Sequence, residues 1–125
     1  MTRILLVDDD QELRNLYEEL LIGAGYQVET SVDGESALAK MTTGGYDLVI
    51  LDIMMPKIDG LEILRRLKAM NPMPKNGPIV MLSALDQAGV INEAISLGAS
   101  GFLHKPELTP DQFLMEVKNY IVEHA

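Results

Sequence analysis

The stretch Arg3-Ile4-Leu5-Leu6-Val7-Asp8-Asp9-Asp10 is a short apolar run that stops at three consecutive aspartates. The pattern returns at Tyr46–Leu51, which ends at Asp52, and again at Ile79–Leu82, which ends at Ser83. Runs of this length that are apolar throughout are typical of the inner strands of a parallel sheet, because such strands are buried on both faces. The three runs therefore predict an α/β protein.

The segments between the apolar runs carry the spacing and the end signals of helices. The expected helices cover Gln11–Ala24, Ser36–Met41, Leu61–Met70, Gln87–Leu97 and a C-terminal segment that opens with the capping box Thr109-Pro110-Asp111-Gln112. Asp10 and Asp33 are the expected N-caps of the first two helices. Two further strands are expected at Tyr26–Ser31 and Ser100–His104, so five strands alternate strictly with five helices.

Strict alternation implies right-handed crossovers and a parallel sheet that is covered on both faces. The expected fold class is α/β, a doubly wound (βα)5 flavodoxin-like three-layer sandwich with strand order 2-1-3-4-5. The Rossmann order suits this length less well, because it normally uses six strands. With 125 residues and no repeat or Ser/Pro-rich linker, the chain is expected to form one domain over residues 1–125.

Composition excludes several classes of function. Ten basic against nineteen acidic residues give a net charge of −9, which argues against binding nucleic acid through its phosphates. The absence of cysteine excludes disulfide scaffolds, zinc–thiolate sites and thiol catalysis. No run of 18 apolar residues is present and the N-terminus lacks the features of a signal peptide, so we expect a cytoplasmic protein without membrane contact.

Four of the predicted strands end at residues that can take part in chemistry. The first strand ends at Asp8 and Asp9, the third at Asp52, the fourth at Ser83 and the fifth at Lys105. In doubly wound sheets, ligands bind at the carboxyl ends of the strands beside the switch point, which lies between the first and third strands. Because adjacent strands are about 4.8 Å apart, the five side chains are expected to share one shallow cleft.

Electrostatic repulsion indicates that this cleft binds a cation. Two like charges about 4 Å apart repel by roughly 4 kcal/mol at an effective dielectric constant of about 20, and one lysine leaves much of the repulsion among three carboxylates uncompensated. Raised carboxyl pKa values or a bound cation would accommodate the cluster. Oxygen ligands favour a hard divalent cation, Mg²⁺ with Mn²⁺ as an alternative. Each aspartate taken singly is also compatible with an ordinary solvated strand end.

The chain resembles the receiver domain of two-component response regulators, with the fold of single-domain chemotaxis regulators, over essentially its whole length. The matching segments, in order, are Ile4-Leu5-Leu6-Val7-Asp8-Asp9-Asp10, Asp47-Leu48-Val49-Ile50-Leu51-Asp52, Met55-Pro56-Lys57-Ile58-Asp59-Gly60, Ile79-Val80-Met81-Leu82-Ser83-Ala84, Leu97-Gly98-Ala99 and Lys105-Pro106. The resemblance implies a phosphorylation-dependent signalling switch. It also implies a regulatory domain and not an enzyme that turns over a separate substrate.

The resemblance implies that Asp52 is the phosphoacceptor. It further implies that Asp8 and Asp9 hold Mg²⁺ together with Asp52, and that the backbone carbonyl of Met54 is the remaining protein ligand. Lys105 corresponds to the residue that pairs with the phosphoryl oxygens, and the peptide bond that follows it is expected to be cis. Phosphoryl transfer depends on positioning and on charge neutralisation, which a carboxylate, a metal and a lysine supply.

The resemblance also implies how the signal leaves the site. The hydroxyl of Ser83 is expected to move toward the phosphoryl group, so that Phe102 turns inward and changes the surface of the fourth helix, fifth strand and fifth helix. Phenylalanine lacks the hydroxyl of the tyrosine that is frequent at this position, so the coupling would depend on packing. Met54 and Leu85 lie where members of the family tune the phosphoryl lifetime, and because both are apolar we expect slow self-dephosphorylation.

The implied partners are a histidine kinase or histidine phosphotransfer protein as donor, and a downstream protein target or an attached output domain. The expected assembly is a monomer or a weak dimer that forms on phosphorylation. The sequence leaves open which kinase and which target are used. It also leaves open whether the chain is a single-domain regulator, a phosphorelay intermediate or the receiver of a longer protein.

Other functions of the same fold remain to be weighed. A pseudo-receiver that acts as an interaction module without phosphorylation is the main alternative, against which the intact acceptor, acidic pair, hydroxyl and lysine argue. A phosphohydrolase of the haloacid dehalogenase type would need a second aspartate at Met54. A flavodoxin-like electron carrier would need a glycine- and hydroxyl-rich loop where Asp8-Asp9-Asp10 stands, and no P-loop motif is present.

Overall fold

The computed structural model describes residues 1–84 and 88–123, and within them the chain forms five β-strands, five α-helices and one short 3-10 helix. The strands are β1 (Arg3–Val7), β2 (Gln27–Ser31), β3 (Leu48–Asp52), β4 (Ile79–Ser83) and β5 (Gly101–His104). The helices are α1 (Gln11–Gly23), α2 (Gly34–Thr43), α3 (Gly60–Lys68), α4 (Ala88–Ser96) and α5 (Pro110–Glu123), with the 3-10 helix η1 (Lys105–Glu107) between β5 and α5. No helix in the described ranges is both long and apolar enough to cross a membrane.

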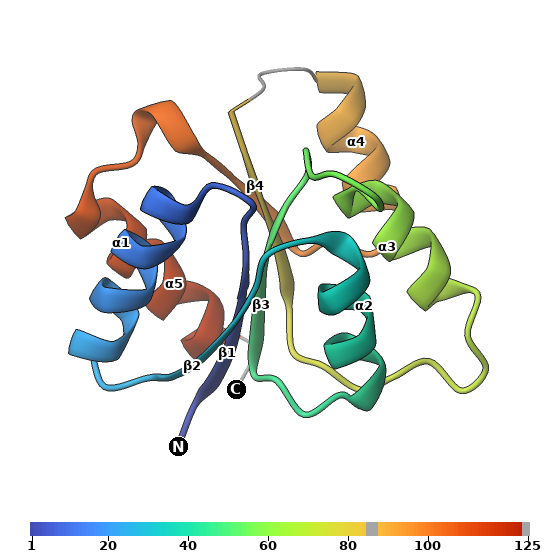
Figure 1. Ribbon diagram of the computed structural model, residues 1–125, viewed down its shortest axis with the longest axis horizontal. Helices are drawn as coiled ribbons and strands as arrows, with labels where there is room; N and C mark the ends of the chain where they lie inside the picture. The colour runs from blue at the N-terminus through green and yellow to red at the C-terminus, as the bar shows by residue number, and fades with distance from the viewer. Residues whose placement is uncertain (85–87, 124–125) are drawn as a thin grey trace.

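The strands form one parallel sheet in the order β2-β1-β3-β4-β5, which confirms the predicted fold class. Helices α1 and α5 cover one face of the sheet, and α2, α3 and α4 cover the other (Figure 1). Successive residues of β1 point to opposite faces, so Ile4 and Leu6 enter the core beneath α1 and α5 while Leu5 and Val7 enter the core beneath α2 and α3. Burial on both faces explains why β1, β3 and β4 are apolar throughout.

The predicted helix caps are present. The side chains of Asp10 and Asp33 each accept a backbone N–H from the first turn of α1 and α2. At the start of α5, the Gln112 N–H donates to Thr109 Oγ1 at 3.1 Å, and the Thr109 N–H donates to the Gln112 side-chain oxygen at 3.1 Å. The capping box is therefore closed in both directions.

The expected cis peptide bond before Pro106 is wrong. The Lys105–Pro106 bond is trans, and the cis bond within the described residues is Asn71–Pro72. Pro106 is the second residue of a helical turn that is closed by the Leu108 N–H and the Lys105 carbonyl at 3.2 Å. A trans proline has the backbone angle that the second position of such a turn requires, whereas cis proline occupies the third.

Strand register brings the ends of the strands level, at the upper edge of the sheet in Figure 1. Asp52 pairs with Leu82, one residue before Ser83, and Ser83 pairs with His104, one residue before Lys105. The residues that end or follow these strands therefore meet at one edge of the sheet.

A side chain from α5 lies against the face of β5 at Gly101. A methyl group at Gly101 would lie 2.5 Å from Cζ of Tyr120, so only glycine lets the phenol ring lie against the strand. Burial raises the pKa of the Tyr120 phenol, and a hydrogen bond with the backbone of Phe102 opposes that rise. The ring thus takes the place of a side chain at position 101, on the face of β5 that α5 covers.

Candidate functional site

Asp8, Asp9 and Asp52 lie together at the carboxyl ends of β1 and β3. One carboxylate oxygen from each residue lies within 4.8 Å of the others. Asp8 and Asp52 are buried, with 0% and 3% exposure, whereas Asp9 is exposed. The arrangement therefore has two fixed carboxylates inside the protein and a third at the surface.

The backbone holds both buried carboxylates in the same way. The Asp10 N–H donates to Asp8 Oδ1 at 2.9 Å, and the Met54 N–H donates to Asp52 Oδ1 at 3.2 Å. In each case the donor lies two residues after the aspartate, which is the usual local hydrogen bond of an aspartate at a turn. The chain fixes one oxygen of each carboxylate by this bond, and the other oxygen lies close to Lys105.

Lys105 is the cation that faces both buried aspartates. Its Nζ donates a hydrogen bond to Asp52 Oδ2 at 3.0 Å and lies 3.1 Å from Asp8 Oδ2. The second contact has the distance of an ion pair but lacks the direction of a hydrogen bond, so Asp8 Oδ2 is buried without a hydrogen-bond donor among the described residues. The ammonium group contacts two of the three carboxylates in the cluster, which leaves an excess of negative charge there.

Burial and charge shift the acidity of the paired groups. Burial raises the pKa of Asp52 to about 6, in spite of the opposing hydrogen bond and charge of Lys105, and the carboxylate of Asp8 adds to the rise. Burial acts to lower the pKa of Lys105, but the hydrogen bond with Asp52 and the charges of both aspartates outweigh it, so this pKa is raised. Lys105 therefore stays charged, and Asp52 ionises less readily than a free aspartate.

The three aspartates fit a divalent cation. They offer three hard oxygen ligands within 4.8 Å of one another, and the buried Oδ2 of Asp8 accepts no hydrogen bond among the described residues. Mg²⁺ prefers such oxygen ligands and would neutralise the excess charge. Asp8, Asp9 and Asp52 would hold the ion, and Met54, whose N–H already binds Asp52, lies on the adjoining loop.

Arg14 supports the cluster from α1 and was not predicted from the sequence. Its Nη1 donates to the backbone carbonyl of Asp8 at 2.8 Å. The bond ties the turn after β1 to the first helix and brings a second positive charge to Asp8. The spacing of residues in the sequence does not identify Arg14, because its hydrogen bond to Asp8 depends on the direction of its side chain.

The loop between β3 and α3 rests on the start of α2. Lys57 adopts a left-handed backbone conformation, with φ 70°, and its Nζ lies 3.4 Å from Asp33 Oδ2 and 3.7 Å from Glu35 Oε2. A methyl group at Gly34 would lie 2.7 Å from the carbonyl carbon of Ile58, so the glycine allows the loop to approach the helix. Since this loop carries the backbone of Met54, its position bears on the candidate metal site.

The comparison with protein families decides what kind of site this is. A family model of the response regulator receiver domain matches residues 4–118. The chain belongs to this family. Receiver domains bind Mg²⁺ at an acidic pocket, and Asp8, Asp9 and Asp52 form such a cluster here.

Curated relatives contain this receiver domain as one part of a longer protein. The chain is 40% identical to the response regulator PleD of Caulobacter vibrioides over 83% of its own length and 23% of PleD. It is 36% identical to a protein-glutamate methylesterase/protein-glutamine glutaminase of Rhodospirillum rubrum over 98% of its own length and 33% of the relative. Across the relatives compared, it spans from a quarter to a half of their length.

Solved structures match the receiver domain almost end to end. The chemotaxis protein CheY4 of Vibrio cholerae is 33% identical, with a TM-score of 0.81 over 96% of this chain and 98% of the other. A CheY-like receiver domain from Methanospirillum hungatei is 26% identical, with a TM-score of 0.87 over 98% and 95% of the two chains. These matches agree with the fold predicted from the strand pattern.

The remaining residues predicted for the receiver site lie on β4, β5 and the loop after β3. Ser83 is buried at the end of β4, beside the strand that carries Asp52. Phe102 is half-buried on β5, packs against the core beneath α4, and its ring centroid lies 6.3 Å from that of His104. The Met54 side chain is 60% exposed, and Leu85 lies outside the described residues.

We expect Asp52→Asn to stabilise the metal-free receiver at neutral pH. Because the pKa of Asp52 rises from 3.8 to about 6 on folding, the folded state binds more protons between these values, and stability falls as the pH rises through that window. Asparagine lacks this ionisation, so the variant should exceed the wild type by about 1–3 kcal/mol above pH 6 and match it below about pH 4. Urea unfolding in EDTA across this pH range measures the difference, and a difference independent of pH would contradict it.

Proposed function

We propose that this receiver domain is a phosphorylation-dependent switch that accepts a phosphoryl group on Asp52 from a histidine kinase or a histidine phosphotransfer protein. The observation that carries the proposal is the buried arrangement of Asp8, Asp52 and Lys105. A carboxylate with a pKa of about 6, 3.0 Å from an ammonium group and beside two further aspartates, combines a nucleophile with the charges that phosphoryl transfer needs.

In the proposed transfer, a carboxylate oxygen of Asp52 attacks the phosphorus of a phosphohistidine. A P–O bond to Asp52 forms as the P–N bond breaks, and the imidazole leaves with the electron pair and takes up a proton. Lys105 keeps its charge and pairs with the phosphoryl oxygens, while the Ser83 hydroxyl donates to another of them. When bound, Mg²⁺, or Mn²⁺ in its place, neutralises charge on the phosphoryl oxygens. Asp8, Asp9, Asp52 and the backbone carbonyl of Met54 would hold the ion.

The proposed output passes from Ser83 to Phe102. The phosphoryl group carries about −1.5 to −2 charges in place of the single charge of the Asp52 carboxylate, so the hydroxyl of Ser83 is drawn toward it. The movement leaves room for Phe102 to turn inward, and the surface formed by α4, β5 and α5 changes for a downstream target or an attached output domain. In this proposal residues 1–125 act as one unit in the cytoplasm, as a monomer or as a weak dimer formed on phosphorylation.

Intact mass after incubation with acetyl phosphate tests the proposal. With Mg²⁺ the protein should gain one phosphoryl group, and it should gain none in excess EDTA. Asp52→Asn should abolish the gain, whereas Asp111→Asn, an exposed aspartate of α5, should leave it unchanged.

A wild-type protein that gains no phosphoryl group would contradict the proposal. No adduct on the wild type, with Mg²⁺ binding confirmed by calorimetry and rapid turnover excluded by a phosphate-release assay, would overturn the role of Asp52. The receiver would then act as an interaction module that is independent of phosphorylation.

A further inference from the structure

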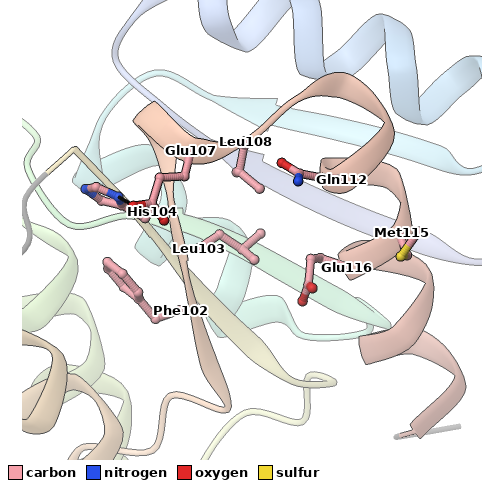
Figure 2. Close-up of a pocket in the computed structure, with 8 residues that line it drawn as sticks. All are labelled: Phe102, Leu103, His104, Glu107, Leu108, Gln112, Met115 and Glu116. Carbon is pink, nitrogen blue, oxygen red and sulfur yellow. Dashed lines mark ion pairs between the residues drawn. The ribbon is translucent and has the colours of Figure 1, made fainter.

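An open groove of about 610 Å³ lies between β5, η1 and α5 (Figure 2), and Asp8, Asp9 and Asp52 are not among the residues that line it. It runs along the edge of the sheet, since β5 is the last strand and pairs with β4 alone. Phe102, the predicted switch residue, lines one side of the groove, and α5 forms the other side in Figure 2.

The groove has an apolar floor and an acidic rim. Leu103 is buried, Leu108 is half-buried, and Met115 is 61% exposed although it is apolar. Glu107 and Glu116 stand at the rim, and the Glu107 side chain is 80% exposed. The lining includes no lysine or arginine. His104, which also lines the groove, has Nδ1 3.6 Å from Glu107 Oε1. The surface therefore pairs apolar contact area with two carboxylates, of which Glu107 has a histidine beside it.

The acidic rim continues along α5 beyond this groove. Glu116 also lines a second hollow of about 420 Å³, together with Asn119, Tyr120 and Glu123. Glu116, Asn119 and Glu123 are spaced by three and four residues, so they follow one face of the helix. Lys118 lies two residues from Glu116 and therefore on a different face. This face of α5 thus carries two carboxylates, Glu116 and Glu123, two turns apart, with the neutral Asn119 between them.

We propose that this groove docks a segment of a partner protein that combines apolar side chains with lysine or arginine. The apolar floor would bury the apolar side chains, and Glu107, Glu116 and Glu123 would pair with the basic ones. The proposal rests on the proposed function, because Phe102 lines the groove and would couple docking to phosphorylation. To that function it adds which kinds of side chain the partner protein presents to the groove.

A second copy of this chain fits the groove less well. A two-fold interface places the same surface on both sides, so the glutamates of one copy would face those of the other without a lysine or arginine from either lining. Like charges across an interface oppose association. The geometry therefore favours a basic partner over self-association.

The test uses the ¹⁵N-labelled full chain, saturating Mg²⁺, and a short peptide of alternating leucine and lysine. A matched peptide carries glutamate in place of lysine. The leucine–lysine peptide should shift backbone amides of β5, η1 and α5, and the matched peptide should not. Glu107→Lys/Glu116→Lys should weaken binding by about tenfold or more, whereas Glu18→Lys/Glu19→Lys on α1, with the same change in net charge, should leave it within about twofold.

Four outcomes would overturn the proposed docking site. Shifts spread over the whole surface, equal weakening by the two double variants, or no preference for the lysine peptide would show only general attraction to an acidic protein. A dimer formed through β5 and α5, seen by sedimentation, would make the occupant a second copy. The same samples are treated with acetyl phosphate and weighed by mass spectrometry. If the protein is phosphorylated but does not bind the peptide, the docking site is wrong and the proposed function stands. If it binds the peptide but is not phosphorylated, the proposed function is wrong and the docking site stands.

Discussion

Replacing Lys105 by methionine is expected to lower the free energy of unfolding in metal-free buffer by about 2–4 kcal/mol. The substitution keeps an unbranched side chain but removes the ammonium group that faces Asp8 and Asp52, whose side chains are 0% and 4% exposed. Breaking a buried ion pair leaves uncompensated charge in a medium that solvates it poorly. Asp52 limits the loss by taking up a proton, so the loss should grow as the pH rises above 6.

Urea unfolding of the wild type and Lys105→Met in EDTA, repeated with Mg²⁺, measures this effect. The matched control is Lys57→Met, which removes an exposed lysine from ion pairs with Asp33 and Glu35 and should cost less than about 1 kcal/mol. Mg²⁺ should stabilise Lys105→Met more than the wild type, because it restores positive charge beside the same carboxylates. A Lys105→Met variant as stable as the wild type in EDTA would show that the buried cluster carries little net charge.

Gly34→Ala is the second large effect we expect, with a loss of about 3 kcal/mol or more in unfolding free energy. The added methyl group would overlap the backbone of Ile58, which cannot turn aside as a flexible side chain would. The loop after β3 would have to move away from α2. Because this loop carries the carbonyl of Met54, affinity for Mg²⁺ should fall together with stability.

Chemical denaturation and calorimetric titration with Mg²⁺ separate these two consequences. Gly23→Ala is the matched control, since Gly23 ends α1 with nothing within 4 Å of an added methyl group. Alanine favours a helix over glycine by up to about 1 kcal/mol, so the control should be neutral or slightly more stable. Equal stability of Gly34→Ala and Gly23→Ala would mean that loop and helix are not tightly packed.

The sheet could be predicted from the sequence because its central strands need apolar side chains on both faces. The same reasoning placed Asp8, Asp52 and Lys105 at one edge, since the carboxyl ends of parallel strands must meet there. The apposition of their side chains, with the distances given above, agrees with that expectation. The roles proposed for them in phosphoryl transfer stay predictions.

The ends of the helices were predicted less well, because packing against other parts of the chain can override the helix preference of a single residue. Helix α2 was expected at Ser36–Met41 but runs from Gly34 to Thr43. Glycine is a poor helix former, yet the close approach of Ile58 requires it at this end. At the other end, Thr42 Oγ1 donates to the Leu38 carbonyl at 2.7 Å, which satisfies a polar side chain within the helix. Helix α4, expected at Gln87–Leu97, is described from Ala88 to Ser96, and Gln87 lies outside the described residues.

The acidic groove was not predicted from composition, because a net charge of −9 says nothing about where the charges gather. Glu107 belongs to η1 and Glu116 to α5, and only the fold brings them to one rim. The same holds for Arg14, whose bond to the Asp8 carbonyl depends on how α1 leaves the sheet.

The Tyr120 ring that lies over Gly101 has a consequence for the redesign of this part of the protein. A side chain at position 101 would occupy the space that the ring fills, so the residues at positions 101 and 120 constrain each other. Any residue larger than glycine at position 101 would push the ring, and with it this part of α5, away from β5. Designers who graft new binding residues onto β5 or α5 should therefore leave Tyr120 and Gly101 in place as a pair.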